Sequence, residues 1–383
     1  MTLIVAAQTV SMYSVFHPSF VTQRWHIFVS YLLCTWIQCL TVLFANKALP
    51  TLEALGGFLI LGGVLITIIV CSVMPHARGV PYATDVSVWR SWVNSTGYSS
   101  NGFVFLLGML NGAYAVGTPD LVSHLAEEVP RPSSNIPKAM MIQFLVGLCT
   151  GLLYLVAIFY TVSDLDGILE STYLFPLTAI YRQATGSAGG TLGLLVLVFL
   201  PTFFCCIGNY ILVSRMFWML ARDNATPFSE YFSRVSERFK NPANSIVLCG
   251  MLCTLLGFVY LGSSTAFNAF VGSYVVLSTL SYLTAILPHL LSGRSSVAPG
   301  WFWMEGPIGY VVNTISCLYI MAFMVVFCFP FTSSVDAASM NYASLITGGL
   351  SLFVAVFWFV RRNNYEGPKY VPLDATLLAK DAI

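Results

Sequence analysis

The feature that most constrains this sequence is a series of long apolar stretches. A helix needs about 20 mostly apolar residues to cross the hydrocarbon core of a bilayer. The full stretches lie at residues 26–46, 51–74, 102–123, 139–162, 191–220, 243–261, 264–288, 307–331 and 342–361. A shorter apolar segment at residues 1–16 is only just long enough to cross. We therefore predict an all-α polytopic membrane protein with about 10 membrane segments.

The composition supports this class and argues against several others. Of the 383 residues, 57% are hydrophobic and 9% are charged, whereas soluble domains carry about 25% charged residues. The net charge of +1 gives no basic surface for nucleic acid. The ten Cys lie scattered in apolar runs without the spacing of a zinc or redox site. We see no hydrolase, kinase or metal-binding pattern, so we predict no enzyme activity, metal or cofactor.

Positive charge is distributed unevenly between the predicted loops. If the C-terminus is cytoplasmic, 13 of the 17 Lys and Arg residues lie on the inner side. Inner loops of membrane proteins carry such an excess. We therefore expect a cytoplasmic tail at residues 362–383. We also expect an integral protein of the plasma membrane, although the charge distribution specifies only the orientation. The inner loop at residues 221–242 mixes positive and negative charges, which predicts an amphipathic surface helix.

The segment LNGAYAVGTPDLVSHLAEEVP, at residues 110–130, interrupts one of the apolar stretches. Gly112 weakens a helix by about 1 kcal/mol relative to Ala. Pro119 lacks an N–H and disfavours helix at the preceding residue. The pattern predicts two half-helices joined by unwound backbone within residues 112–119. Unwound backbone inside a bilayer needs cover from protein or a water-filled cavity, and transporters use it to bind solutes. A kink that serves packing alone is the alternative.

Four titratable residues follow the break: Asp120, His124, Glu127 and Glu128. Ionisable groups within a membrane are costly and usually face an interior. Asp120 could hold a substrate amine, carry a proton, or only cap the second half-helix. His124 lies on the same helix face at i+4 and could relay a proton or form a structural hydrogen bond. Glu127 and Glu128 either belong to an inner gate or are solvated charges at a helix end.

Several segments resemble fungal amino-acid and choline permeases, including those for GABA, of the amino acid–polyamine–organocation (APC) superfamily. They are HLAEEVPRPSSNIPKAM at 124–140, STYLFPLTAIYRQATGSAGGT at 171–191, MFWMLARDNATPFS at 216–229 and HPSFVTQRWH at 17–26. The resemblance covers nearly the whole chain. It implies a LeuT-like APC fold, in which two inverted repeats form the core and two further helices lie at the periphery.

The same resemblance implies a domain layout. Residues 1–383 form a single transmembrane permease domain, in which residues 1–74 are the remnant of the first inverted repeat. Residues 102–288 are the second repeat, and residues 307–361 form the two peripheral helices. In this layout the chain begins inside the family's third helix and lacks roughly the first two and a half helices.

The resemblance also implies a function: transport of an amino acid or related amine, such as GABA or choline, by proton-coupled alternating access. The partners are then the solute, protons and the lipid bilayer. The implied substrate-binding residues are Gly112, Ala113, Tyr114, Ala115, Val116, Gly117, Asp120 and Asn209. Tyr114 either forms a wall for a cationic amine or packs between helices. The alternative function is a non-transporting, truncated paralogue that acts as a membrane sensor or partner subunit.

Overall fold

The computed structural model describes residues 1–115, 119–126, 129–295, 297, 299–300, 302–337, 339–363 and 365. Within these ranges, nine segments are long and apolar enough to cross a membrane. Each coincides with one of the nine full stretches predicted from the sequence, so the polytopic helical class is confirmed. The described chain has no strands beyond an isolated bridge between Ser236 and Asn241.

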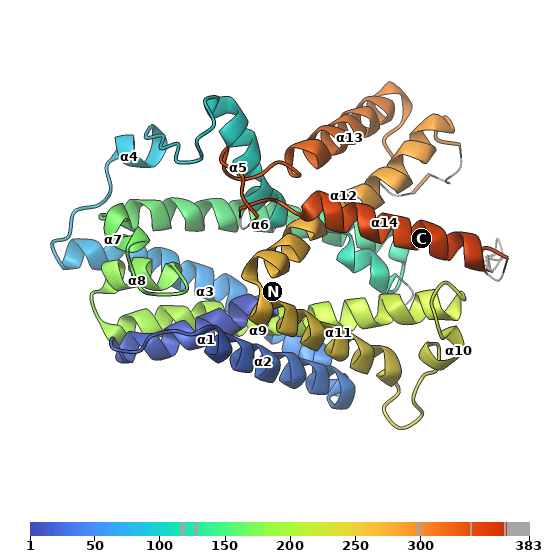
Figure 1. Ribbon diagram of the computed structural model, residues 1–383, viewed down its shortest axis with the longest axis horizontal. Coiled ribbons are helices and arrows are strands. Elements are labelled where there is room, and N and C mark those ends of the chain that lie inside the picture. Colours follow the sequence, from blue (N-terminus) through green and yellow to red (C-terminus); the bar gives the residue numbers. More distant parts are fainter. Residues whose placement is uncertain are drawn as a thin grey trace. The chain divides into compact units, whose positions relative to one another are not determined.

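The structure divides into two compact units, which we describe separately. The first unit comprises Met1–Trp92, Val146–Arg222 and Thr226–Gly262. Its elements are α1 (Thr2–Phe16), α2 (Arg24–Phe44), η1 (Asn46–Ala48), α3 (Leu49–Ala77), α4 (Asp85–Trp89), the second half of α6 (Pro132–Thr161), α7 (Leu165–Leu169), α8 (Leu177–Thr185), α9 (Ala188–Arg222), α10 (Ser229–Phe232) and α11 (Ala243–Gly262). The longest helix, α9, packs against α1, α2, α3, α8, α10 and α11, so the first unit is organised around it (Figure 1).

Two buried glycines on α3 allow this helix to approach α9 closely. A Cβ at Gly56 would lie 2.9 Å from the Cβ of Phe204, and one at Gly63 would lie 3.0 Å from the carbonyl oxygen of Leu197. Small residues at helix contacts let backbones come together inside a membrane, where van der Waals packing drives association. The neighbouring Gly57 and Gly62 have no heavy atom within 4 Å of a Cβ position.

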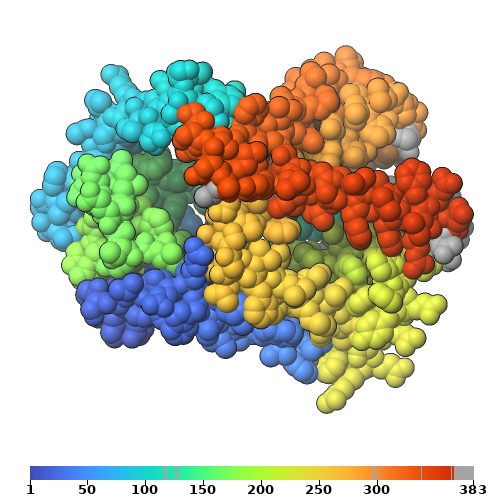
Figure 2. Space-filling model, in the orientation of Figure 1, coloured from blue at the N-terminus to red at the C-terminus, as the bar shows by residue number. Residues whose placement is uncertain are grey.

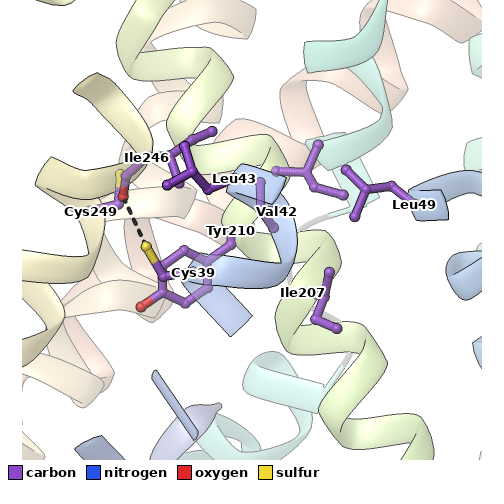
Figure 3. Close-up of a cluster of buried hydrophobic side chains, with 9 residues drawn as sticks. Cys39, Val42, Leu43, Leu49, Ile207, Tyr210, Ile246 and Cys249 are labelled. Atoms are coloured by element: carbon purple, nitrogen blue, oxygen red, sulfur yellow. Dashed lines mark hydrogen bonds between the residues drawn. The ribbon is translucent and has the colours of Figure 1, made fainter. Parts of the chain in front are cut away.

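A cluster of buried side chains joins α2, α3, α9 and α11 (Figure 3). Its members are Cys39, Val42, Leu43, Leu49, Ile207, Tyr210, Ile211, Ile246 and Cys249. The thiol of Cys39 donates a hydrogen bond to the Ile246 carbonyl oxygen at 3.7 Å. This cysteine therefore packs as a small apolar side chain with a weak donor, as expected for Cys in an apolar run.

The connection between α7 and α9 is fixed by the short helix α8. Arg78, which follows α3, donates hydrogen bonds to the carbonyl oxygens of Gln183 (2.7 Å) and Ala184 (3.1 Å). Gly186 ends α8 with a φ of 66°, a left-handed conformation that glycine adopts without steric cost. The Arg78 guanidinium lies directly over Gly186, because a Cβ there would meet its Cζ at 2.1 Å.

The second unit comprises Val93–Leu145, Asp223–Ala225 and Ser263–Ile383. Its elements are α5 (Asn101–Ala115), η2 (Pro119–Leu125), the first half of α6, α12 (Ser264–Leu291), α13 (Gly306–Val326) and α14 (Ala343–Arg361). Helix α12 packs against α5, α13 and α14. Figure 2 shows α14 on the visible face. Its outward side chains, such as Leu352 and Val360, are 67% and 74% exposed, which is typical of a lipid-facing helix.

Two predicted elements differ from the structure. The loop at 221–242 contains only the short helix α10, because Asn224, Phe228 and Lys240 adopt positive φ angles of 52° to 60° that no regular helix accommodates. The stretch at 307–331 leaves the helix at Val326. Pro330 lies shortly beyond, and a proline disfavours helical conformation at the residue before it.

Candidate functional site

Asp120 is held by two side chains of the second unit. Its Oδ1 accepts a hydrogen bond from the hydroxyl group of Tyr282 on α12. Its Oδ2 lies 3.6 Å from Nε2 of His124. The side chains of Asp120 and His124 are 33% and 26% exposed. The carboxyl group therefore lies in a partly covered site with a partner at each oxygen.

The local sequence explains why Asp120 is presented in this way. Pro119 begins η2, and its fixed φ suits the first position of a helical turn. Asp120 follows in that first turn, where a negative charge interacts favourably with the helix N-terminus. The hydroxyl of Ser123 donates to the Asp120 carbonyl oxygen at 2.6 Å. The turn is thus closed by its own side chains, and His124 lies on the same side as Asp120.

Tyr282 is the functional candidate that sequence analysis missed. Neighbouring hydroxyl groups on α12, those of Ser278, Thr279 and Ser281, donate hydrogen bonds to carbonyl oxygens of their own helix. Such short side chains are satisfied locally, whereas the longer tyrosine side chain reaches η2. The available signal was a tyrosine within the polar run STLSYLTA. Tyr282 and Asp120 are 162 positions apart in the sequence, so a local hydrophobic or polar pattern does not predict their contact.

The predicted register of the helix break is corrected. Helix α5 remains helical to Ala115, so Gly112, Ala113, Tyr114 and Ala115 do not form unwound backbone. One glycine costs a helix about 1 kcal/mol, which is too little to end an apolar helix supported by its neighbours. A different helical conformation, that of η2, is observed from Pro119 onward.

Several predicted residues lie outside the described part of the chain. These are Val116 and Gly117 of the predicted unwound backbone, and Glu127 and Glu128 of the predicted inner gate. Their roles therefore stay predictions.

Tyr114 and Ala113 contact the core of the second unit. Both pack against a cluster formed by Val275, Val276 and Phe327. The ring of Tyr114 lies edge-on to Tyr274, with centroids 6.1 Å apart and an interplanar angle of 70°. The packing role considered for Tyr114 is thus observed, and its role as a wall for solute stays a prediction.

Two further observations concern side chains outside the Asp120 cluster. Asn209 belongs to α9 in the first unit, where its Nδ2 donates to the Cys205 Sγ at 3.9 Å. Among the described residues, no group of three or more His, Cys, Asp or Glu side chains is arranged to hold a metal ion.

Comparison with known proteins places these features in context. A family model described as "Amino acid permease" matches residues 1–351. The chain is 32% identical to the choline transporter of Saccharomyces cerevisiae over 374 residues, covering 96% of this chain and 63% of the relative. It is 28% identical to the transmembrane transporter swnT of Metarhizium robertsii, covering 93% of this chain and 70% of the relative. It is also 27% identical to the amino-acid permease BAT1 of Arabidopsis thaliana, covering 72% of this chain and 54% of the relative. The chain thus spans less than two thirds of the length of the choline transporter.

Proposed function

We infer that this chain, which belongs to the amino acid permease family, carries a small amine or amino acid across a membrane. The observation that supports this most strongly is the Asp120 cluster. In a predicted membrane-spanning segment, the Asp120 carboxyl group accepts a hydrogen bond from the Tyr282 hydroxyl and lies 3.6 Å from the His124 imidazole. Ionisable groups are costly inside a membrane, and helix packing alone does not require them. Relatives whose names describe choline and amino-acid transport agree with this proposal.

The geometry suggests how the cluster works. The carboxylate of Asp120 attracts the positive amine of a solute, and the Tyr282 hydroxyl fixes the orientation of Oδ1. Charge-assisted hydrogen bonds of this kind are roughly twice as strong as neutral ones. The Nε2 atom of His124 lies 3.6 Å from Oδ2, so His124 is placed to exchange a proton with this oxygen. The solute amine at the carboxylate and the proton between His124 and Oδ2 are then held by one carboxyl group, which couples their movements.

We further propose proton-coupled alternating access at the plasma membrane with a cytoplasmic C-terminus. The distribution of Lys and Arg supports this orientation. The solute class is an amino acid, GABA, choline or a related amine, because Asp120 supplies negative charge for a cationic group in each of them.

Uptake assays in a permease-null host test the proposal. Cells that express the chain should accumulate at least one radiolabelled solute from a panel of choline, GABA and α-amino acids, and unlabelled members of the panel should compete. A collapsed pH gradient should reduce the accumulation. If a protein verified at the cell surface accumulates nothing above the empty-vector level for the whole panel, the proposed function is wrong.

A further inference from the structure

Glu53 is an acidic residue inside a membrane-spanning segment, and the site around Asp120 does not involve it. It lies in the first turns of α3, within the span Asn46–Ala77. Its Oε1 is buried and has no hydrogen-bond partner, although the side chain as a whole is partly exposed. An ionisable group at such a position is costly and is retained for a function more often than for stability.

The carboxyl group of Glu53 faces a gap in the surface of α9. A Cβ at Gly208 would lie 3.1 Å from Oε2 and 3.3 Å from Oε1, so the absence of a side chain there makes room for the carboxyl group. Cys205 lies one turn from Gly208 on the same helix. Given a rise of about 1.5 Å per residue, Gly208 lies more than about 20 Å from either end of α9. The carboxyl group therefore lies against the middle of the longest helix.

Among the described residues, no cation forms an ion pair with Glu53. Helix α6 contacts α3, since the Thr161 hydroxyl donates to the Cys71 carbonyl oxygen, and its second half carries the titratable side chains Cys149, Tyr154 and Tyr160. The other elements packed against α3 are η1, α8 and α9. Their titratable or charged side chains are Lys47, Tyr181, Arg182, Cys205, Cys206, Tyr210, Arg215 and Arg222, and α3 itself adds Cys71 and His76. In the described part of the chain, none of these cations forms an ion pair with Glu53.

The chemistry of the site favours a proton over a metal cation. Metal cations such as Ca²⁺ or Mg²⁺ need several oxygen ligands. Gly208 has no side chain, and the Cys205 thiol supplies no oxygen. The carbonyl groups in the middle of α9 are engaged in the helix. A proton needs only one carboxylate oxygen. Once bound, it removes the charge whose burial costs free energy.

We propose that Glu53 is a proton-binding site in the first unit, distinct from Asp120, and that it gains and loses one proton during each transport cycle. The step forms and breaks only the O–H bond of the carboxyl group. This inference rests on the proposed transport function, but proton binding at Glu53 can be tested without it.

Chemical labelling tests proton binding directly. A hydrophobic carbodiimide adds to protonated carboxyl groups in apolar surroundings, and mass spectrometry locates the adduct. In the purified full chain we expect an adduct on Glu53 and none on Glu170, an exposed acid at the end of α7. The Gly208→Ala variant should label less, because its Cβ displaces the carboxyl group. Gly193→Ala, on the same helix with no atom within 4 Å of its Cβ position, should label normally. Absence of the Glu53 adduct, or equal labelling of both glycine variants, would overturn the proposal.

Transport by proteoliposomes tests the coupling. Glu53→Gln should retain solute exchange in the absence of a pH gradient, but its net uptake should be accompanied by fewer protons per solute, since only the proton at the Asp120 cluster remains. Glu170→Gln should leave both properties unchanged. Unchanged proton influx in Glu53→Gln contradicts the inference, and so does loss of exchange in a variant that elutes as folded protein. If the unsubstituted chain moves no solute at all, the proposed function fails, and carbodiimide labelling still decides whether Glu53 binds a proton.

Discussion

The close contact of α3 with α9 predicts different effects for two adjacent glycine substitutions. Gly56 faces α9, where an added Cβ would meet the Cβ, Cγ and Cδ2 of Phe204 at 2.9, 3.5 and 3.8 Å. Carbon atoms in favourable contact lie about 3.5–4.0 Å apart. Gly57 has open space at its Cβ position. The Gly56→Ala variant must therefore move one helix, whereas the Gly57→Ala variant moves nothing.

The magnitude follows from comparing the two variants. Replacing Gly with Ala in a helix interior stabilises it by up to about 1 kcal/mol, and this gain is common to both positions. Overpacking of a well-packed contact costs about 1–3 kcal/mol, and this cost applies to Gly56 alone. We therefore expect the free energy of unfolding of Gly56→Ala to be about 1–3 kcal/mol below that of Gly57→Ala.

The assay is unfolding in mixed detergent micelles with increasing dodecyl sulfate, followed by circular dichroism. The pair Gly63→Ala and Gly62→Ala repeats the comparison two turns further along α3, since only Gly63 meets a backbone atom of α9, at 3.0 Å. If Gly56→Ala and Gly57→Ala unfold at the same dodecyl sulfate fraction, α3 and α9 are not packed through these glycines.

Three further predictions concern the site, the α8 connection and the orientation. Tyr282→Phe removes the donor to Asp120, and since a hydrogen bond to a charged group contributes about 1.5–3 kcal/mol, the KM for uptake should rise while Tyr319→Phe, at an exposed position on α13, leaves it unchanged. Gly186→Ala introduces a side chain at a φ of 66° beneath the Arg78 guanidinium, so it should lower the Tm in detergent, whereas Gly189→Ala, in open space, should not. A tag at the C-terminus should resist an impermeant protease in intact cells and become cleavable after permeabilisation, and cleavage in intact cells would refute the orientation.

The membrane-spanning helices could be predicted because their signal is local. Each stretch of about 20 apolar residues must satisfy its backbone internally, and a helix does so without reference to the rest of the chain. The helix ends were less accurate, because they depend on single residues such as Pro330 and on positive φ angles such as that of Phe228. Neither effect appears in a hydropathy pattern.

The candidate site was only partly predictable. Asp120 and His124 lie close together in sequence, and their spacing indicated a shared face. Their partner Tyr282 comes from a distant helix, so its role emerges only from tertiary structure. The prediction of unwound backbone at Gly112 was wrong, because α5 is helical there. The packing of Ala113 and Tyr114 on α12 stabilises the helix and outweighs the weakening effect of one glycine. The sequence does not identify Glu53 as a candidate, because an acidic residue near a predicted helix end is usually solvated. Its contact with α9 at Gly208 depends on the tertiary structure.

The measurement that tests the central claim most directly is solute accumulation by Asp120→Asn. This change keeps the size of the side chain and removes the negative charge. In the unsubstituted chain the carboxyl group accepts a hydrogen bond from Tyr282 and lies close to His124. We predict that the variant inserts and reaches the membrane at the unsubstituted level but accumulates no solute, whereas Asp166→Asn, in the exposed helix α7, accumulates normally. Accumulation by Asp120→Asn at the rate of the unsubstituted chain, with the same dependence on the pH gradient, would contradict the account.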